Sequence, residues 1–458
     1  MGEKTKQSTK APLFGGRELL FSQRELLLLV GPLLVEQLLE VTVGMADTMM
    51  VSRCGEAAIS GVSLVDMINN LIIVLFAALA TGGAVVVSQY LGAREQKKAD
   101  ASSGQLILLS ALLGAGVALF CFVLARPMLR LCYGSIEADV LDAGVLYLKI
   151  TALSYPFLAL YNAGAALFRS MGNSKISMQI SVLMNIINIV GNAVCIFGLK
   201  MGVDGVAWPS VISRVVAAAL ILARCYQKGH ALTVPKTIKL DGKMAKRILG
   251  IGIPSAFENS LFEAGRILVV SMISTFGTVQ IAANAVANSV CTAANVPGAT
   301  MNLAMIPVVG RCLGAGDKEQ AKKYSLQLTG IAIVGLGLTN LAMFLLLPEI
   351  ITWFHLSAEA ASMCTVVVHW FSVFCVVFWA PSFTLPNALR SGGDAKFTML
   401  VSIASMWVFR VILSYFFVLQ MHMGLTGVWF GMFVDWICRS ILFGVRFYSG
   451  KWMEHKVI

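Results

Sequence analysis

The chain has 458 residues, of which 57% are hydrophobic and only 13% are charged, and its formal net charge is +11. Soluble globular proteins carry roughly 25% charged residues. With a mean hydropathy of +0.79, this chain has too few polar side chains to cover a water-exposed surface. The composition excludes a soluble multidomain protein, a disordered chain, a coiled coil and a nucleic-acid-binding protein, and it indicates that lipid surrounds the fold.

The apolar segments are long enough to form transmembrane helices, because a bilayer core spans about 20 helical residues. Twelve segments carry few or no charged side chains: 26–50, 59–91, 106–124, 140–168, 176–199, 206–222, 248–276, 279–309, 326–347, 360–389, 397–419 and 425–445. Strands of a membrane β-barrel would be about 10 residues long with alternating polarity, and no segment alternates. We therefore expect an all-α polytopic membrane protein with twelve transmembrane helices.

The basic residues are distributed unevenly between the two sides of these helices. With a cytoplasmic N-terminus, 26 of the 35 Lys and Arg residues fall on the cytoplasmic side, four on the outer side and five within the helices. Cytoplasmic segments of membrane proteins are enriched in Lys and Arg. The distribution predicts a multi-pass protein of the cell (inner) membrane with both termini in the cytoplasm.

The second half of the chain repeats the first at a nearly constant offset. Pro32 and Glu36 correspond to Pro254 and Glu258. At the same offset, LGAREQKKA, which begins at position 91, corresponds to LGAGDKEQAKK, which begins at position 313. RSMGNSK corresponds to RSGGDAK with the register shifted by a single position. Several segments in one register indicate an internal duplication.

Each half contains six predicted helices, an even number, so both halves enter the membrane from the same side. Such repeats are related by a pseudo-twofold axis along the membrane normal, and in transporters the two bundles rock around a site between them. The expected domains are a cytoplasmic N-terminal segment (1–24), an N-terminal six-helix lobe (25–226), a basic cytoplasmic linker (227–247), a C-terminal six-helix lobe (248–448) and a cytoplasmic tail (449–458).

The first predicted helix carries three acidic residues, Glu36, Glu40 and Asp47. At 100° per residue they lie within about 40° of one face. Three ionised carboxylates facing lipid would cost about 8–10 kcal/mol, so this face should line a cavity, where the carboxylates share a proton or bind Na⁺. A buried hydrogen-bonded patch is the alternative interpretation.

The seventh predicted helix contains Glu258, Glu263 and Arg266. Arg266 follows Glu263 at the i,i+3 spacing, which places both on one side of a helix, so we expect these two to form an ion pair. Glu258, the repeat counterpart of Glu36, is then the preferred candidate for ion coupling, and Glu263 stays a second candidate.

Carboxamide side chains recur at helical spacing in three other predicted helices. Amides bind cations through their carbonyl oxygens and hydrogen-bond organic substrates, but they also join transmembrane helices to one another. The candidate substrate-binding residues are Asp66, Asn69 and Asn70 in the second helix, Asn185, Asn188 and Asn192 in the fifth, and Asn284 and Asn288 in the eighth.

Further ionisable residues lie within predicted helices of the second half. Arg439 follows Asp435 at the i,i+4 spacing and is expected to pair with it, whereas Arg410 has no partner at helical spacing. His369 is interpreted as a hydrogen-bonded core residue in preference to a proton relay.

Motifs of other functional classes are absent from the sequence. It contains no GxxxxGK[ST] loop, HExxH, GxSxG or clustered His/Cys set, so we expect no enzymatic activity, no ATP motor, no metal site apart from Na⁺ at the acidic residues, and no cofactor other than H⁺ or Na⁺ as coupling ion. The intramembrane basic residues leave a second function open, that of a flippase for a lipid-linked sugar or another amphipathic lipid. The expected partners are organic small molecules and the lipid bilayer, and the chain is predicted to function as a monomer.

The chain resembles the multidrug and toxic compound extrusion (MATE) family from about position 25 to position 448. The resemblance rests on GPLLVEQLLEVTVGMADTMMVSRCGE near the start, on the loops SQYLGAREQKKAD and GRCLGAGDKEQAKKY, and on the paired segments LFRSMGNSK and ALRSGGDAK. It implies a secondary antiporter that exports drugs, often organic cations, as H⁺ or Na⁺ enters the cell.

The resemblance also implies roles for particular residues. Asp47, in ADTMMVS, matches the family's first-helix aspartate, which is implicated in cation coupling, and Asn185 or Asn188 matches a polar position of the N-terminal lobe. Glu263 and Glu258 compete for the match to a seventh-helix glutamate of the NorM-type branch. That branch also has a tenth-helix aspartate, which this chain lacks, so coupling is expected chiefly at the acidic residues of the N-terminal lobe.

Overall fold

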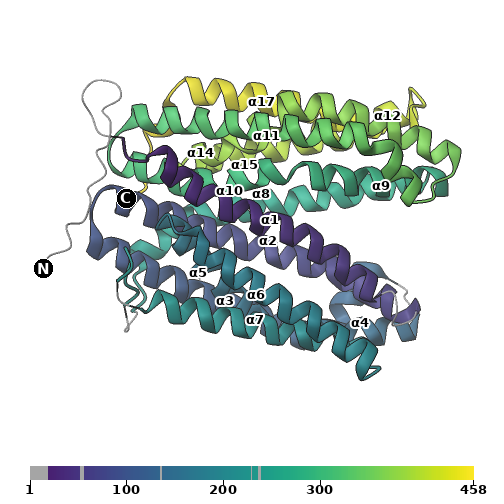
Figure 1. Ribbon diagram of the computed structural model, residues 1–458, viewed down its shortest axis with the longest axis horizontal. Helices are drawn as coiled ribbons and strands as arrows, with labels where there is room; N and C mark the ends of the chain where they lie inside the picture. The colour runs from purple at the N-terminus through teal and green to yellow at the C-terminus, as the bar shows by residue number, and fades with distance from the viewer. Residues whose placement is uncertain (1–18, 52–55, 135–136, 228, 236–238) are drawn as a thin grey trace, which may run out of the picture.

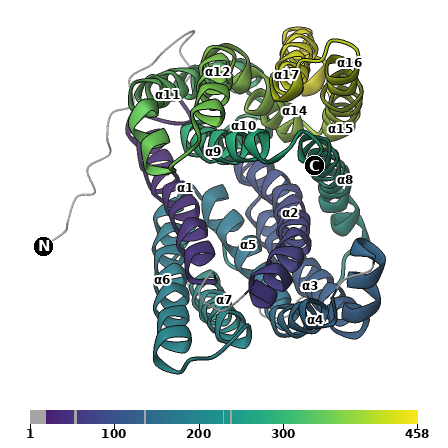
Figure 2. The same cartoon turned by 90° about the vertical axis from the view of Figure 1, so that its right-hand side faces the viewer.

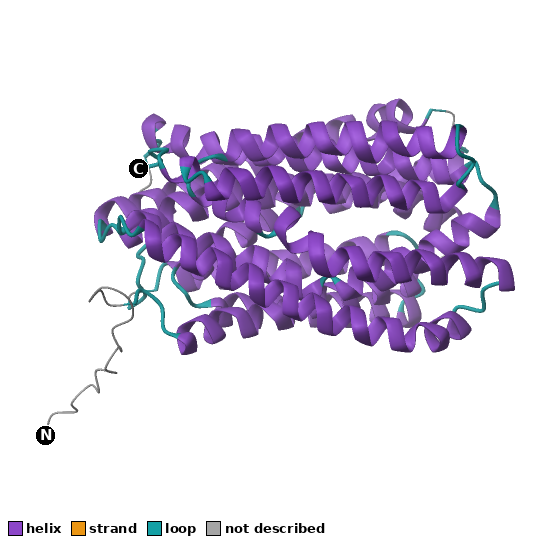
Figure 3. Ribbon diagram, turned by 90° about the horizontal axis from the view of Figure 1, so that it is seen from above, coloured by secondary structure: helices purple, strands orange, loops and turns teal. Residues whose placement is uncertain are grey.

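The structure is a computed structural model that describes residues 19–51, 56–134, 137–227, 229–235 and 239–458. Long helices run along the longest axis of the molecule, and the described residues contain no β-strand (Figure 1). Most connecting loops lie at the two ends of the bundle (Figure 3). The all-α architecture predicted from composition and span length is therefore confirmed.

The helices of the first half form one layer of the bundle, drawn from purple to teal in Figure 1. They are α1 (Gln23–Val51), α2 (Glu56–Gly92), α3 (Gln96–Tyr133), α4 (Ala138–Ala152), α5 (Tyr155–Ser170), α6 (Ser174–Ala193), the π-helix η1 (Val194–Gly198) and α7 (Asp204–Cys225).

The helices of the second half form the other layer, drawn from green to yellow, and Figure 2 shows the two layers end-on. They are α8 (Gly242–Ser274), α9 (Thr278–Ala294), α10 (Val296–Gly314), α11 (Lys318–Trp353), α12 (Ala358–Phe374), η2 (Cys375–Trp379), α13 (Ala380–Phe383), α14 (Leu385–Ser391), α15 (Ala395–Ser405), η3 (Met406–Leu413), α16 (Ser414–Leu419), α17 (Gly424–Tyr448) and the short η4 (Lys451–Met453).

The candidate membrane spans among these elements agree with the sequence-based expectation. Ten helices are long and apolar enough to cross a bilayer, and the pair α4 and α5, bent by 47°, makes an eleventh span. The remaining long helix, α8, is less apolar because it contains six charged residues. With α8, and with the 17-residue α9 counted together with α10, which follows it directly, the described chain contains twelve spans, six in each half.

The outer faces of the rods are apolar. In α11, Val334, Leu338, Leu341 and Leu345 are exposed, and their spacing at i+3 or i+4 places them on one stripe. The opposite side of α11, including Leu336, is buried in the second half. Large exposed apolar stripes would be unstable in water, so this surface is suited to lipid.

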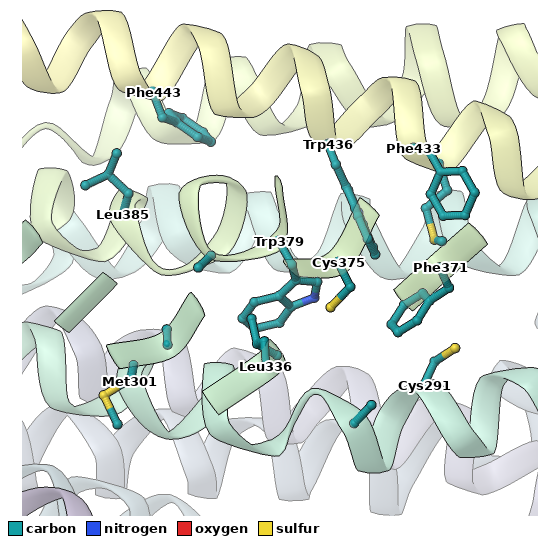
Figure 4. Packing of buried hydrophobic residues seen from close by; sticks show 14 of the residues in the cluster. Cys291, Met301, Leu336, Phe371, Cys375, Trp379, Leu385, Phe433, Trp436 and Phe443 are labelled. Atoms are coloured by element: carbon teal, nitrogen blue, oxygen red, sulfur yellow. The ribbon is translucent and has the colours of Figure 1, made fainter. Parts of the chain in front are cut away.

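The interior of the second half is rich in aromatic side chains (Figure 4). The rings of Phe374 and Phe433 stack with centroids 4.5 Å apart, and Trp436 packs edge-on against Phe433 at 5.9 Å. Small residues also contribute in both halves: a Cβ at Gly164 in α5 would meet the side chain of Ile221 in α7, and a Cβ at Gly298 in α10 would meet the ring of Trp379. Small residues let transmembrane helices approach closely, so both repeats use glycines to reach dense packing.

The two halves contact each other closely at the end of the bundle where α1 begins and the chain ends, which we call the terminal end (Figure 1). A Cβ at Gly92 in α2 would overlap the carbonyl oxygen of Arg311 in α10, and a Cβ at Gly314 in α10 would overlap the carbonyl oxygen of Gln89 in α2. Gly314 is the repeat counterpart of Gly92, and Arg311 is that of Gln89. The contact is therefore reciprocal across the pseudo-twofold axis.

Two hydrogen bonds reinforce this reciprocal contact. Gln89 Nε2 donates to the carbonyl oxygen of Ser391 at 2.7 Å, and Arg311 Nε donates to the carbonyl oxygen of Ser170 at 2.9 Å. Each bond runs from one half to the other, and the two bonds are repeat counterparts to within a single position. The terminal end of the bundle is closed by four matched interactions.

Candidate functional site

A cavity of about 620 Å³ lies between the two halves, away from the closed terminal end. Its residues come from α1 (Gln37, Glu40, Val41 and Gly44), from α9 (Asn288, Ser289 and Thr292) and from the junction of α9 and α10 (Asn295, Val296 and Ala299). Ala299 precedes Gly314 by about four helical turns, which correspond to about 22 Å along a helix. The cavity is large enough for an organic molecule of drug size.

Glu40 is the acidic residue of this cavity wall. It accepts a hydrogen bond of 2.9 Å from Gln37 Nε2, one turn earlier in α1. The first-helix motif therefore presents at least one carboxylate to a cavity, as its spacing predicted. Asp47 lies further along α1, but its side chain falls outside the described part of the structure.

Glu36 points to a different neighbour from Glu40. Its Oε1 lies 3.7 Å from Arg169 Nη1 at the end of α5, and Ser177 Oγ in α6 donates to its Oε2 at 3.4 Å. The two charged side chains are only 11% and 14% exposed. Glu36 is thus held between α5 and α6 as one member of a largely buried ion pair.

Glu258 forms the corresponding ion pair in the second half. Its Oε1 lies 2.6 Å from Arg390 Nη2, and Arg390 Nη1 donates to Asn387 Oδ1 at 2.7 Å. Because Glu258 is the repeat counterpart of Glu36 and Arg390 that of Arg169, each half contains the same buried Glu–Arg pair. The sequence carried this signal in the repeated segments, but nothing in it linked each glutamate to an arginine on a helix so distant along the chain.

A second polar cavity, of about 250 Å³, surrounds the Glu258–Arg390 pair. Asn259, Asn302 and Arg439 also line it. Glu258 Oε2 and Asn302 Oδ1 are buried and have no hydrogen-bond partner among the described residues. The site therefore has acceptor oxygens that a proton, a cation or water would satisfy.

Two further ion pairs of the second half form within single helices. Arg266 Nη2 lies 2.9 Å from Glu263 Oε2, and Arg439 Nε lies 2.9 Å from Asp435 Oδ1, so both predicted pairs are confirmed. His369 stacks against Phe344 with ring centroids 4.2 Å apart.

The second-helix candidates join a hydrogen-bond network inside the first half. Asn69 Nδ2 donates to Asp66 Oδ1 at 3.2 Å, and Tyr147 Oη in α4 lies 3.4 Å from the same oxygen. Tyr155 Oη in α5 donates to Asn69 Oδ1 at 2.6 Å. Asn70 is half-buried and adds nothing to this network. Sequence reasoning missed Tyr147 and Tyr155, because aromatic residues in an apolar helix give no distinguishing signal.

The fifth-helix asparagines lie in α6 and contact α7. Asn188 Nδ2 donates to Ser210 Oγ at 2.9 Å, and Asn192 Nδ2 donates to Asn188 Oδ1 at 3.3 Å, while Asn185 is half-buried. In the second half, Trp429 Nε1 donates to Asn284 Oδ1 at 3.1 Å. The candidates are therefore distributed over several polar groups and do not form a single site.

The described residues contain no group of three or more His, Cys, Asp or Glu side chains that would hold a metal ion. The acids instead stand singly or beside arginine. A carboxylate that gains a proton loses its attraction for a neighbouring arginine, so each Glu–Arg pair has two states that differ in local contacts. This chemistry suits a conformational change driven by an ion better than covalent catalysis.

Comparison with known proteins agrees with this geometry. The family model MatE matches residues 32–194 and again 254–416, at the offset of the internal repeat. The uncharacterized transporter YisQ of Bacillus subtilis is 28% identical over 433 residues, which cover 93% of this chain and 94% of YisQ. The probable multidrug resistance protein NorM of Thermotoga maritima is 25% identical, with 95% and 94% covered.

Solved structures share the fold. One described as the outward-facing conformation of a multidrug resistance MATE family transporter has a TM-score of 0.87 at 21% identity, covering 93% of this chain and 96% of that chain. The predicted architecture of twelve transmembrane helices in two six-helix bundles is thus confirmed. The chain belongs to the MatE family, and the protein is a membrane transporter and not an enzyme.

Proposed function

We propose that the protein is a secondary active efflux antiporter, which exports amphipathic, often cationic, organic compounds in exchange for H⁺ or Na⁺. The observation that carries this proposal is the cavity of about 620 Å³ between the halves, with the Glu40 carboxylate in its wall. Glu40 is the one charged residue among the residues that line this cavity, and the others are neutral polar or apolar. Its carboxylate attracts an organic cation and a coupling ion to the same place, so the two compete. Competition at one site is what couples the two fluxes.

The closed terminal end supports alternating access. The glycine contacts between α2 and α10 seal one end of the inter-lobe space, while the cavity lies beyond them. Transporters built from two repeats expose a central site to each side in turn by rocking the repeats. With the terminal end in the cytoplasm, as the Lys and Arg distribution predicts, this structure corresponds to the state open to the outside.

The ion-coupling candidates are Glu36, Glu40, Asp47, Glu258 and Glu263. Glu40 is proposed to meet the substrate, since it lines the large cavity. Glu36 and Glu258 are proposed to act through their arginines, since protonation of either glutamate removes the charge that holds Arg169 or Arg390 in place. Glu263 has a lesser role, since its partner Arg266 is half-exposed and compensates its charge.

Several further properties belong to this proposal. The lobes are residues 25–226 and 248–448, joined by a basic cytoplasmic linker, and the protein resides in the cell membrane with both termini inside. The chain functions as a monomer, because its two six-helix halves pack against each other within one chain and enclose the cavity between them. The names of the relatives, among them a probable multidrug resistance protein, support drugs and other toxic compounds as substrates.

The test is ethidium flux in vesicles under an imposed proton gradient or an imposed sodium gradient. We expect flux to depend on the proton gradient at least as strongly as on the sodium gradient. Glu40→Gln should reduce it at least tenfold, whereas Glu263→Gln, the matched control, should reduce it less than threefold. Equal flux in wild type and Glu40→Gln would remove the cavity carboxylate from the mechanism, and flux driven by sodium but indifferent to pH would contradict proton coupling.

The second candidate function is a flippase for a lipid-linked sugar or another amphipathic lipid. It is favoured by three arginines in membrane-spanning helices of the second half, Arg266, Arg410 and Arg439. Two of them, Arg266 and Arg410, line a small pocket beside the large cavity. Translocation of a phosphate-linked lipid by reconstituted protein that moves no ethidium would favour this function over drug efflux.

A further inference from the structure

A small pocket lies in the second half beside the large cavity. It has a volume of about 30 Å³ and is lined by Arg266, Asn284, Asn288, Arg410 and Trp429, with apolar residues between them. One water molecule needs about 10–15 Å³ on this measure, so the pocket holds two waters or one small polar group. Asn288 lines both this pocket and the cavity of about 620 Å³, so the pocket adjoins the proposed substrate space, and we call it the recess.

Arg410 is the distinctive residue of this recess. Its Nε is buried and has no hydrogen-bond partner, and its guanidinium makes no hydrogen bond or ion pair with any described residue. It lies 5.3 Å from the ring centroid of Phe262, and Arg439 lies at the same distance from that ring. Arg410 is partly buried, and it faces the pocket with no ion-pair partner among the described residues. A partly desolvated guanidinium without an anion is costly, so an anion bound at this position would be stabilised.

The neighbouring charges leave Arg410 uncompensated. Arg266 is paired with Glu263, and Arg439 with Asp435. Three arginines and two carboxylates give this core a formal surplus of one positive charge. The arginine without a paired carboxylate, Arg410, is therefore also a residue that lines the pocket of about 30 Å³.

The internal repeat shows that the surplus is specific to the second half. Arg410 is the repeat counterpart of Asn188, and Asn288 is that of Asp66. At both positions the second half is more positive by one charge than the first. Arg410 also lies in the π-helix η3, an irregularity that is frequent at functional sites.

We propose that the recess at Arg410 binds a single small anionic group, so that the transporter accepts amphiphiles carrying an acid as well as a cationic centre. This inference rests on the proposed efflux function and names a class of substrate for it. The cationic centre lies near Glu40 in the large cavity, and the carboxylate enters the recess past Asn288 to meet Arg410. The negative group is either a carboxylate of the substrate or a free halide ion.

The experiment compares two dyes that differ in this group alone. Rhodamine 110 carries a free carboxylate beside its cationic ring system, and rhodamine 123 is its methyl ester. Fluorescence polarisation of each dye with purified full-length protein gives a ratio of affinities that is insensitive to general loss of binding. We expect Arg410→Gln to lower the preference for rhodamine 110 over rhodamine 123 by about ten- to hundredfold, because a charge-assisted hydrogen bond is lost, and Arg410→Lys to restore part of it.

Arg214→Gln is the matched control, because Arg214 is an intramembrane arginine of the first half whose Nη1 donates to Ser154 Oγ at 2.7 Å. The affinity ratio should not change in this variant. Replacing gluconate by chloride in the buffer identifies the source of the anion. If chloride weakens the binding of rhodamine 110 but not that of rhodamine 123, the recess also binds free halide. If chloride affects neither dye, the recess binds only the substrate carboxylate.

An unchanged ratio in Arg410→Gln overturns the proposal. If that variant also unfolds at a lower temperature, as Asp435→Asn would, then Arg410 serves as a structural counter-charge for the unpartnered Asp435 Oδ2. Dye binding is measured without any gradient, so the two proposals are tested separately. Absence of ethidium flux would refute the efflux function but not anion binding in the recess. An unchanged affinity ratio together with normal flux would refute only anion binding in the recess.

Discussion

The paired Glu and Arg residues are the clearest feature at the scale of single residues. Glu258–Arg390 is short and almost fully buried, whereas Glu36–Arg169 is longer, at 3.7 Å, and shares Glu36 with Ser177. Removing one partner of a buried ion pair leaves an uncompensated charge. The two pairs should therefore contribute unequally to stability although they are repeat counterparts.

We predict that Arg390→Gln destabilises the protein by about 3–5 kcal/mol and that Arg169→Gln destabilises it by less. Thermal unfolding of the purified variants gives the comparison. The double variant Glu258→Gln with Arg390→Gln should recover most of the loss, because it removes both charges. Equal effects of Arg169→Gln and Arg390→Gln, or no recovery in the double variant, would show that the pairs do not contribute as charges.

The sequence predicted single residues well only where the partner lies on the same helix. Glu263–Arg266 and Asp435–Arg439 follow the i,i+3 and i,i+4 rules, and both were found. Arg169 and Arg390 lie in the last turns of α5 and α14, and their side chains reach glutamates of α1 and α8. Such contacts between distant segments depend on how helices pack, and spacing rules do not contain that information.

At the scale of elements, the crossing of α2 and α10 closes the terminal end. Gly92 and Gly314 allow backbone contact that no side chain would permit. Most helix boundaries were close to the predicted spans, because charged and glycine-containing loops mark them. By contrast, α3 and α11 continue well past the predicted spans 106–124 and 326–347 into charged segments. The π-helices η1, η2 and η3 were not predicted, since an extra residue in a helical turn leaves apolar periodicity nearly unchanged.

We predict that Gly314→Val prevents closure of the terminal end and shifts the protein toward the opposite conformation. Spin labels at the exposed positions Lys97 and Lys318 should be further apart in this variant than in an otherwise identical labelled protein, and substrate flux should fall at least fivefold. Gly330→Val in α11 is the control, because a Cβ at Gly330 meets nothing within 4 Å. Unchanged label distances in Gly314→Val would show that the glycine contact does not determine the state.

At the scale of the whole molecule, composition and repetition predicted most of the fold. The even number of spans in each half predicted two parallel bundles, and the packing of α2 against α8 and α10 joins them. The cavity was expected from the one-faced acids, but its walls were not, because they combine α1 with α9 and the beginning of α10. Sequence periodicity describes each helix separately and does not say which helices face each other.

The orientation of the molecule is predicted from its Lys and Arg residues. A green fluorescent protein fused after position 458 should fluoresce, and alkaline phosphatase inserted in the loop after position 199 should be active, because the first needs the cytoplasm and the second needs the outside. Neutralising the basic residues Arg224, Lys243, Lys246 and Arg247 should increase the fraction of molecules that insert in the opposite orientation. The reverse pattern of reporter activity would invert the proposed direction of access.

The reciprocal crossing of Gly92 and Gly314 is of the kind that two identical subunits make across a twofold axis. A half-length ancestor, inserted in one orientation, would therefore have formed the same crossing as a homodimer before its two genes fused. After fusion, each copy was able to change independently of the other. Position 188 is an asparagine and its counterpart, position 410, is an arginine, and a dimer of identical chains would have the same residue at both positions.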